Sequence, residues 1–143
     1  MITKIAKDFY WEMSHRLPFH KGPCKNIHGH SYKIRVEISG EPDINGIVID
    51  YYDLKLVMLP LIEQLDHSFV VDENDSLMIN FLKENDMKYF ILNKTTTAEN
   101  LAEYIFIEIK KQLRNKFNNI SHLTVRLFET DDVYAEVDGQ INN

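Results

Sequence analysis

The stretch HGHSYKIRVEIS, residues 28–39, alternates between apolar or aromatic and polar side chains along most of its length. Successive side chains of a β-strand point to opposite faces of a sheet, so this period of two predicts a strand with one buried side. The side chains of that buried side are His28, His30, Tyr32, Ile34, Val36 and Ile38. The pattern therefore places two imidazole rings on the apolar face of a strand.

The segment that precedes this stretch predicts a partner strand. Its apolar parity comprises Ile5, Phe9, Trp11, Met13 and His15. Consecutive strands commonly pair, which would bring a third ring to the same sheet edge. A lone histidine is commonly a packed side chain, but three buried imidazoles are costly without partners and are suited to zinc with one open position. We therefore expect His15, His28 and His30 to hold Zn²⁺.

Helical periodicity follows the turn residues Asn45 and Gly46. Asp50 is suited to cap a helix whose apolar stripe is Leu54, Val57, Met58, Leu61 and Leu65. The residues TTAEN, 96–100, predict the start of a second helix, because Thr96 and Glu99 have the spacing of a capping box. Two final strands alternate through Leu123, Val125, Leu127 and Glu129, and through Val133, Ala135 and Val137.

The Val71–Asn93 connection has weaker patterns. Ser76 could cap a short helix that runs to Leu82, and KYFIL, residues 88–92, could form a strand. The main order is strand, strand, helix, helix, strand, strand. This order indicates an α+β fold with a four-stranded antiparallel sheet and two helices on one face, in a single domain that spans residues 1–143.

Composition restricts the function classes. The net charge of −6 argues against a nucleic-acid surface, and an anionic ligand would need a local basic patch such as Arg16, Lys21 and Lys25. No apolar run approaches the length of a membrane span. A single cysteine among 143 residues suits the reducing cytosol, so we expect a cytoplasmic protein.

Cys24 lies four residues before His28, in the stretch CKNIHGHSY. In a loop beside a cation and Lys25 the pKa of its thiol would fall, and the thiolate could act as base or nucleophile. The competing interpretation is a structural zinc site of one cysteine and three histidines, in which the sulfur is inert. The spacing permits both.

Two further polar features stand at predicted element ends. Asp66 and His67 end the first helix, where His67 would either interact with the helix carbonyls or be oriented by Asp66 for proton transfer. Glu129 falls on the apolar side of a strand end. It would lie at the solvent edge or bind a pair of N–H groups through both oxygens.

Six segments occur in an order that resembles one enzyme family: FYWEMSHRL, CKNIHGHSY, GIVIDYYDLK, LDH, TTAENLAEYI and FETDDVYAE. From about Lys4 to Glu136 the chain is similar to the 6-pyruvoyltetrahydropterin and 6-carboxytetrahydropterin synthases. The resemblance implies the tunnelling fold (T-fold). Protomers of that fold join their sheets into a barrel, commonly as a hexamer made of two trimers with sites at protomer interfaces.

The resemblance also implies roles for individual residues. The matching metal ligands are His15, His28 and His30, and the matching catalytic residues are Cys24, Asp66 and His67. Glu129 matches a carboxylate that anchors the pterin ring, and Thr97 and Glu99 match a loop that lines the pterin pocket.

The three residues KNI between Cys24 and His28 look like the spacing of the bacterial carboxy enzymes. The implied reaction converts 7,8-dihydroneopterin triphosphate to 6-carboxy-5,6,7,8-tetrahydropterin, with release of acetaldehyde and triphosphate, in queuosine biosynthesis. The alternative within the family is the pyruvoyl enzyme, which keeps the whole side chain. The loop TTTAEN, where bacterial members commonly have Pro-Thr, and the long Val71–Asn93 connection depart from the family pattern.

Overall fold

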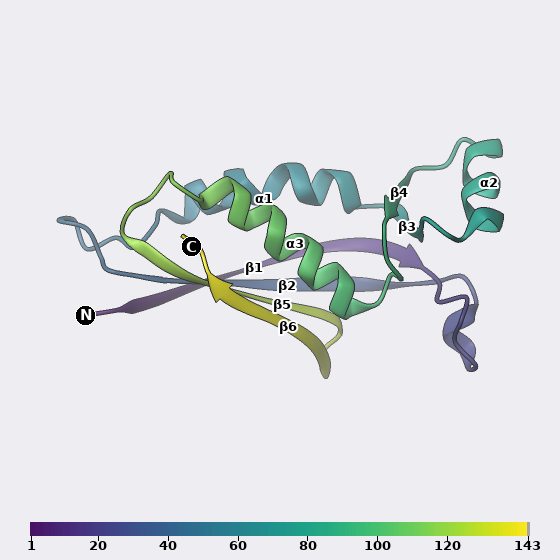
Figure 1. Ribbon diagram of the computed structural model, residues 1–143, viewed down its shortest axis with the longest axis horizontal. Coiled ribbons are helices and arrows are strands. Elements are labelled where there is room, and N and C mark those ends of the chain that lie inside the picture. The colour runs from purple at the N-terminus through teal and green to yellow at the C-terminus, as the bar shows by residue number, and fades with distance from the viewer. Residues whose placement is uncertain (143) are drawn as a thin grey trace.

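The computed structural model of the protein describes residues 1–142. Its elements in chain order are β1 (Thr3–His15), β2 (His28–Gly40), α1 (Tyr51–Leu65), β3 (Ser68–Asp72), α2 (Ser76–Glu84), β4 (Tyr89–Leu92), α3 (Ala98–Leu113), β5 (Ile120–Thr130) and β6 (Val133–Gln140). The helices α1 and α3 lie on one face of the sheet, as predicted, and the other face is open (Figure 1). The α+β class is confirmed.

The sheet has six strands in the order β4-β3-β1-β2-β5-β6, so the expected four-stranded sheet was too small. The strands β1, β2, β5 and β6 are antiparallel, as predicted. β3 pairs in parallel with the end of β1, and β4 pairs in parallel with β3. The sequence did not indicate β3 because Phe69, Val70 and Val71 are all buried, which leaves an apolar run with no alternation.

The buried parities of β1, β2 and β5 form the core together with α1 and α3. Tyr32, Ile34, Val36 and Ile38 of β2 are fully buried, as are Leu54 of α1 and Leu101 of α3. A smaller cluster of Phe69, Val71, Met78 and Leu82 packs α2 on β3. The short helix and the strand expected in the Val71–Asn93 connection are both present, as α2 and β4, but the expected cap is wrong by one position because Asp75 and not Ser76 caps α2.

The start of α3 corrects one prediction. The N-cap is Thr97, whose hydroxyl accepts a hydrogen bond from the backbone N–H of Asn100. The capping box assigned to Thr96 is wrong by one position. Thr96 is buried, and its side chain hydrogen-bonds to the end of β1 instead.

Several elements meet at one end of the molecule, where the three histidines lie. β1 ends there and β2 begins there, in a register that pairs His15 with His28 and Met13 with His30. The loop of residues 16–27 projects from this end, and β3, α2 and β4 lie beside it (Figure 1). Among residues 1–142, no helix is long and apolar enough to cross a membrane.

Candidate active site

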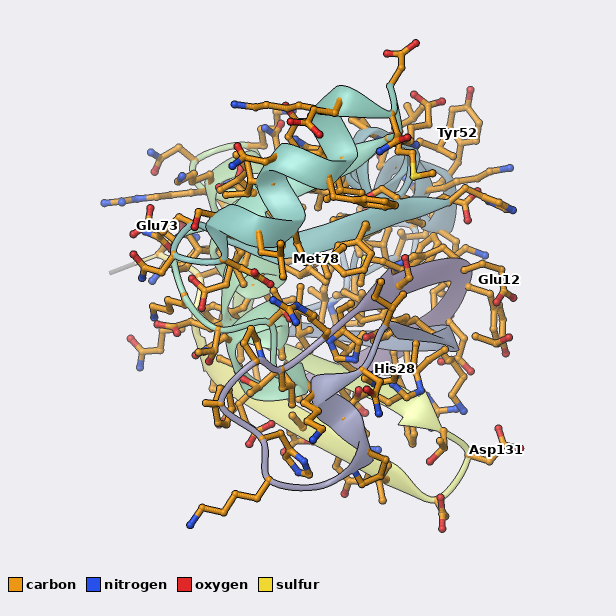
Figure 2. All side chains as sticks on the ribbon, turned by 90° about the vertical axis from the view of Figure 1, so that its right-hand side faces the viewer. Glu12, His28, Tyr52, Glu73, Met78 and Asp131 are labelled. Atoms are coloured by element: carbon orange, nitrogen blue, oxygen red, sulfur yellow. The ribbon has the colours of Figure 1, made fainter. Side chains whose placement is uncertain are left out.

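Three histidines cluster at the end of the β1–β2 pair. The ring centroids of His15 and His28 are 4.6 Å apart, and that of His30 lies 5.3 Å from His15 and 5.2 Å from His28. One nitrogen from each ring lies within 4.8 Å of the other two. Figure 2 looks onto this end of the molecule and shows His28 near its centre. The alternation of two paired strands thus gathers three nitrogen donors at one point, where they could hold a metal ion.

Two backbone carbonyls orient these rings. Nδ1 of His15 lies 2.7 Å from the carbonyl oxygen of Thr96, and Nδ1 of His28 lies 2.8 Å from that of Asn26. A carbonyl only accepts hydrogen bonds, so in both rings Nδ1 carries the proton and Nε2 presents its lone pair. Metal-binding histidines in proteins are commonly oriented in this way.

The cluster fits a metal ion on two further observations. Nε2 of His15 and Nε2 of His30 are buried and make no hydrogen bond of good geometry within residues 1–142, although the Glu129 carboxylate lies close to both. Burial lowers the pKa of His30, so its ring is held in the neutral form that binds metals. Three imidazoles in a partly buried position form a donor set suited to zinc.

Glu129 lies between this cluster and a cavity. Its Oε2 is 2.9 Å from Nε2 of His30 and 3.4 Å from Nε2 of His15. The nearby His15 ring has the largest effect on the pKa of the Glu129 carboxyl and lowers it, and burial opposes this effect. The side chain is therefore ionised at neutral pH and can accept hydrogen bonds from N–H groups.

Two cavities flank the cluster. One, of about 370 Å³, is formed by the start of α3 and by β5 and β6, and its lining includes Ala98, Glu99 and Glu129. The other, of about 380 Å³, is lined in part by Glu12, His30 and His67. Glu129 and Glu99, which the sequence suggested as ligand contacts, therefore share one cavity. Thr97 does not line it and serves as the helix cap.

Asp66 and His67 form a pair at the end of α1. Oδ2 of Asp66 lies 3.0 Å from Nδ1 of His67, while Oδ1 accepts a hydrogen bond from the backbone N–H of Glu12. His67 has a left-handed backbone with φ of 57°, and its N–H donates to the carbonyl of Glu12 at 2.7 Å. These bonds fix the pair on β1, and they turn the His67 side chain, which is 76% exposed, toward the second cavity. The hydrogen bond from Glu12 is the largest effect that lowers the pKa of Asp66.

Cys24 lies in a short 3₁₀ turn, Pro23–Lys25, in the loop that connects the two strands bearing the histidines. Its side chain is half-buried, and its carbonyl accepts a hydrogen bond from the N–H of Leu17. The metal-binding group found in residues 1–142 consists of the three histidines without the thiol. The structure thus does not assemble the donor set of one cysteine and three histidines.

Sequence reasoning did not identify Asn26 and Thr96 as contacts of the histidine rings. Both act through their carbonyl oxygens, which every residue possesses, so the identity of the side chain carries no signal. Glu12 was also missed as a cavity residue, because it looked like any charged residue on the outer face of a strand.

Comparison with known proteins gives the context of this geometry. Residues 4–140 match the family model described as 6-pyruvoyl tetrahydropterin synthase. The chain is 37% identical to the 6-carboxy-5,6,7,8-tetrahydropterin synthase of Haemophilus influenzae, over 93% of this chain and 96% of the relative. It is 31% identical to the enzyme of the same name from Aquifex aeolicus, over 95% of this chain and 98% of the relative.

Solved structures agree on the fold. The 6-pyruvoyltetrahydropterin synthase of Plasmodium vivax, solved as an E37C mutant, matches with a TM-score of 0.80 at 18% identity, over 98% of this chain and 99% of the other. The Caenorhabditis elegans 6-pyruvoyl tetrahydropterin synthase matches with a TM-score of 0.69 at 24% identity, over 97% and 96% of the two chains. At such identities these matches show the T-fold alone.

Proposed function

Because this chain belongs to the 6-pyruvoyl tetrahydropterin synthase family and is thus a tetrahydropterin synthase and a lyase, we propose that it is a zinc-dependent 6-carboxy-5,6,7,8-tetrahydropterin synthase. Its substrate is 7,8-dihydroneopterin triphosphate. One water is consumed, and acetaldehyde and triphosphate are released with the carboxylated ring. The observation that supports this proposal best is the cluster of His15, His28 and His30 beside the ionised Glu129.

The carboxy product has more support than the pyruvoyl product. Several relatives that cover nearly the whole chain are named as carboxy enzymes, at 37% and 31% identity. The two solved structures described above, which are named as pyruvoyl enzymes, are 18% and 24% identical and indicate the fold only. The short spacing between Cys24 and His28 agrees with the carboxy assignment. If it holds, the enzyme supplies a precursor of queuosine and itself has no need to contact tRNA.

Zinc, held through Nε2 of the three histidines, would act as a Lewis acid that acidifies the side-chain carbons of the substrate. Glu129 would bind the pterin ring, because an ionised carboxylate accepts a pair of N–H groups through its two oxygens. The cavity that Glu129 shares with Glu99 is the site proposed for the ring.

His67 and Cys24 are the groups proposed to move protons. Asp66 holds Nδ1 of His67, so Nε2 of this exposed ring is free to accept a proton from the substrate. The loop that carries Cys24 joins β1 and β2, the two strands that carry the proposed ligands, and we propose that its thiol takes part in proton transfer with His67.

A non-catalytic structural zinc domain is the competing function. It has less support, because the thiol lies outside the three-histidine group and because two cavities adjoin that group. A closed structural site needs neither a free position nor an oriented, exposed His67.

The decisive experiment is incubation of the zinc-loaded protein with 7,8-dihydroneopterin triphosphate, followed by mass analysis of the pterin and an assay for acetaldehyde. We expect 6-carboxytetrahydropterin and acetaldehyde in equal amounts. A product that retains the three-carbon side chain, with no acetaldehyde, would assign the pyruvoyl reaction. Unchanged substrate in the presence of bound zinc would instead favour the structural alternative.

We also propose that the protein acts as a hexamer of two trimers. The strand β6 forms one margin of the sheet, and its side chains are largely exposed or half-buried, which leaves it available for pairing with another protomer. Sedimentation equilibrium should give six times the chain mass of 16.9 kDa. A monomer would refute this assembly without affecting the assignment of the metal ligands.

A further inference from the structure

Arg16, the residue after the proposed ligand His15, makes a bidentate ion pair with Asp75. Its Nε donates to Oδ2 at 2.7 Å and its Nη2 donates to Oδ1 at 2.6 Å. The Asp75 side chain is only 4% exposed and that of Arg16 is 19% exposed. Parallel hydrogen bonds between a guanidinium and a carboxylate fix orientation as well as distance. The pair thus connects the end of β1 to the segment between β3 and β4.

Asp75 is itself rigidly held. It is the N-cap of α2, and its Oδ1 accepts a hydrogen bond from the backbone N–H of Met78 at 3.3 Å. α2 packs on β3 through Met78 and Leu82. The carboxylate that binds Arg16 is therefore attached to a packed helix and not to a mobile side chain.

The end of β1 requires such support. His15 and His28 form the last residue pair of the β1–β2 ladder. On the other side of β1, β3 pairs with Met13 and Ser14 and reaches no further. His15 is thus bound by the sheet on one side only, at a strand end, where backbone pairing frays most easily. Thr96 provides two further restraints at this point: its hydroxyl donates to the Arg16 carbonyl at 3.2 Å, and its carbonyl lies 2.7 Å from Nδ1 of His15.

We propose that Asp75 is a positioning residue of the metal centre, which holds the His15 ring in register with His28 and His30 by anchoring Arg16 to α2. This inference rests on the proposed metal site and assigns a role to the long connection between α1 and α3. The pair engages Nε and Nη2 of Arg16 and offsets its charge, so Arg16 is less available than a free cation to bind the triphosphate.

The substitution Asp75→Asn isolates the ion pair. Asparagine is as good an N-cap as aspartate, so the hydrogen bond from Met78 and the start of α2 should persist. The charge that holds Arg16 is lost. Arg16→Lys is the reciprocal variant, because lysine keeps the positive charge but cannot form the bidentate contact with Asp75.

The same strand offers a matched control. Asp8 and Arg35 form a bidentate pair with distances of 2.8 Å and 3.0 Å, between β1 and β2 and far along the ladder from His15. Asp8→Asn therefore removes an ion pair of the same type from β1 and leaves the metal end untouched.

The measurement is the affinity of the metal-free protein for Zn²⁺, by competition with a chromophoric chelator, together with the visible spectrum of the Co²⁺ form and the melting temperature without metal. We expect Asp75→Asn and Arg16→Lys to weaken Zn²⁺ binding about tenfold or more and to change the Co²⁺ spectrum. Asp8→Asn should leave the Zn²⁺ affinity within about twofold, because distant sites act independently.

Three results would overturn the proposal. The first is Zn²⁺ affinity of Asp75→Asn equal to that of the unmodified protein. The second is an equal loss in Asp8→Asn, which would show a general effect of stability. The third is failure of both Asp75→Asn and Arg16→Lys to fold without metal, which would make the pair a support of the fold as a whole. None of these measurements uses the pterin substrate or its product, so they test the role of Asp75 independently of the proposed reaction.

Discussion

The left-handed backbone of His67 allows its chemical role to be tested apart from its structural one. Its φ of 57° is strained for most side chains but is tolerated by asparagine. His67→Asn removes the imidazole and keeps the N–H that donates to Glu12. We expect the free energy of unfolding of this variant to stay within about 0.5 kcal/mol of that of the unmodified protein, since the His67 ring is mostly exposed. His67→Ala should be less stable by about 1 kcal/mol, because alanine has no side-chain polar group to favour this conformation.

The loss of activity should depend on removal of the His67 imidazole and not on the backbone conformation at this position. Loss of a general acid or base lowers kcat by about 10²–10⁴-fold, and we expect this loss in both variants despite their different stabilities. Zinc content should be unchanged, because His67 lies outside the three-histidine group. The assays are single-turnover conversion of 7,8-dihydroneopterin triphosphate and urea unfolding. Turnover by His67→Asn within about threefold of the original would refute the proton-transfer role.

Three shorter predictions concern neighbouring groups. Cys24→Ala should retain zinc by metal analysis but lose turnover, and release of zinc would favour the structural-site alternative. Thr96→Val should lower the free energy of unfolding by about 1–2 kcal/mol relative to Thr96→Ser in urea, because the partly buried Arg16 carbonyl loses its hydroxyl donor; equal stability of the two variants would contradict this. Arg16 lowers the pKa of Asp75 below the ordinary 3.8, so the stabilisation is present above that value and is lost as the pH falls through the folded-state pKa. The stability difference between the original protein and Asp75→Asn should therefore shrink below about pH 4 in acid titrations, and a constant difference would disprove the linkage.

The sequence alone predicted the parts of the fold that have a clear period. Alternation identified β1 and β2 and showed that His15, His28 and His30 share a face, and the helical stripe identified α1. It did not identify β3, because a strand buried on both faces has no alternation. It also placed the cap of α3 one residue too early, since Thr96 and Thr97 are equally suited to capping and only the tertiary contact of Thr96 separates them.

The sequence predicted those parts of the site that depend on the type of side chain. It did not predict the contacts that depend on three-dimensional geometry. Histidine parity and the Asp66–His67 pair were visible in the sequence. The carbonyl contacts of Thr96 and Asn26 carry no residue signature. The Arg16–Asp75 pair joins residues far apart in the chain, and no local pattern marks Asp75 as the partner of Arg16.

The placement of all three histidines on one pair of consecutive strands has a consequence for how the enzyme matures. Short loops close with little entropy loss, so the nitrogen donors can meet as soon as β1 and β2 pair. Glu129 belongs to β5, and local contacts generally form before distant ones. During synthesis, the ribosome thus completes the strands that carry the three histidines well before the strand that carries Glu129, the residue proposed to bind the pterin ring. We expect a nascent chain to compete for zinc at a stage when it cannot yet bind a pterin.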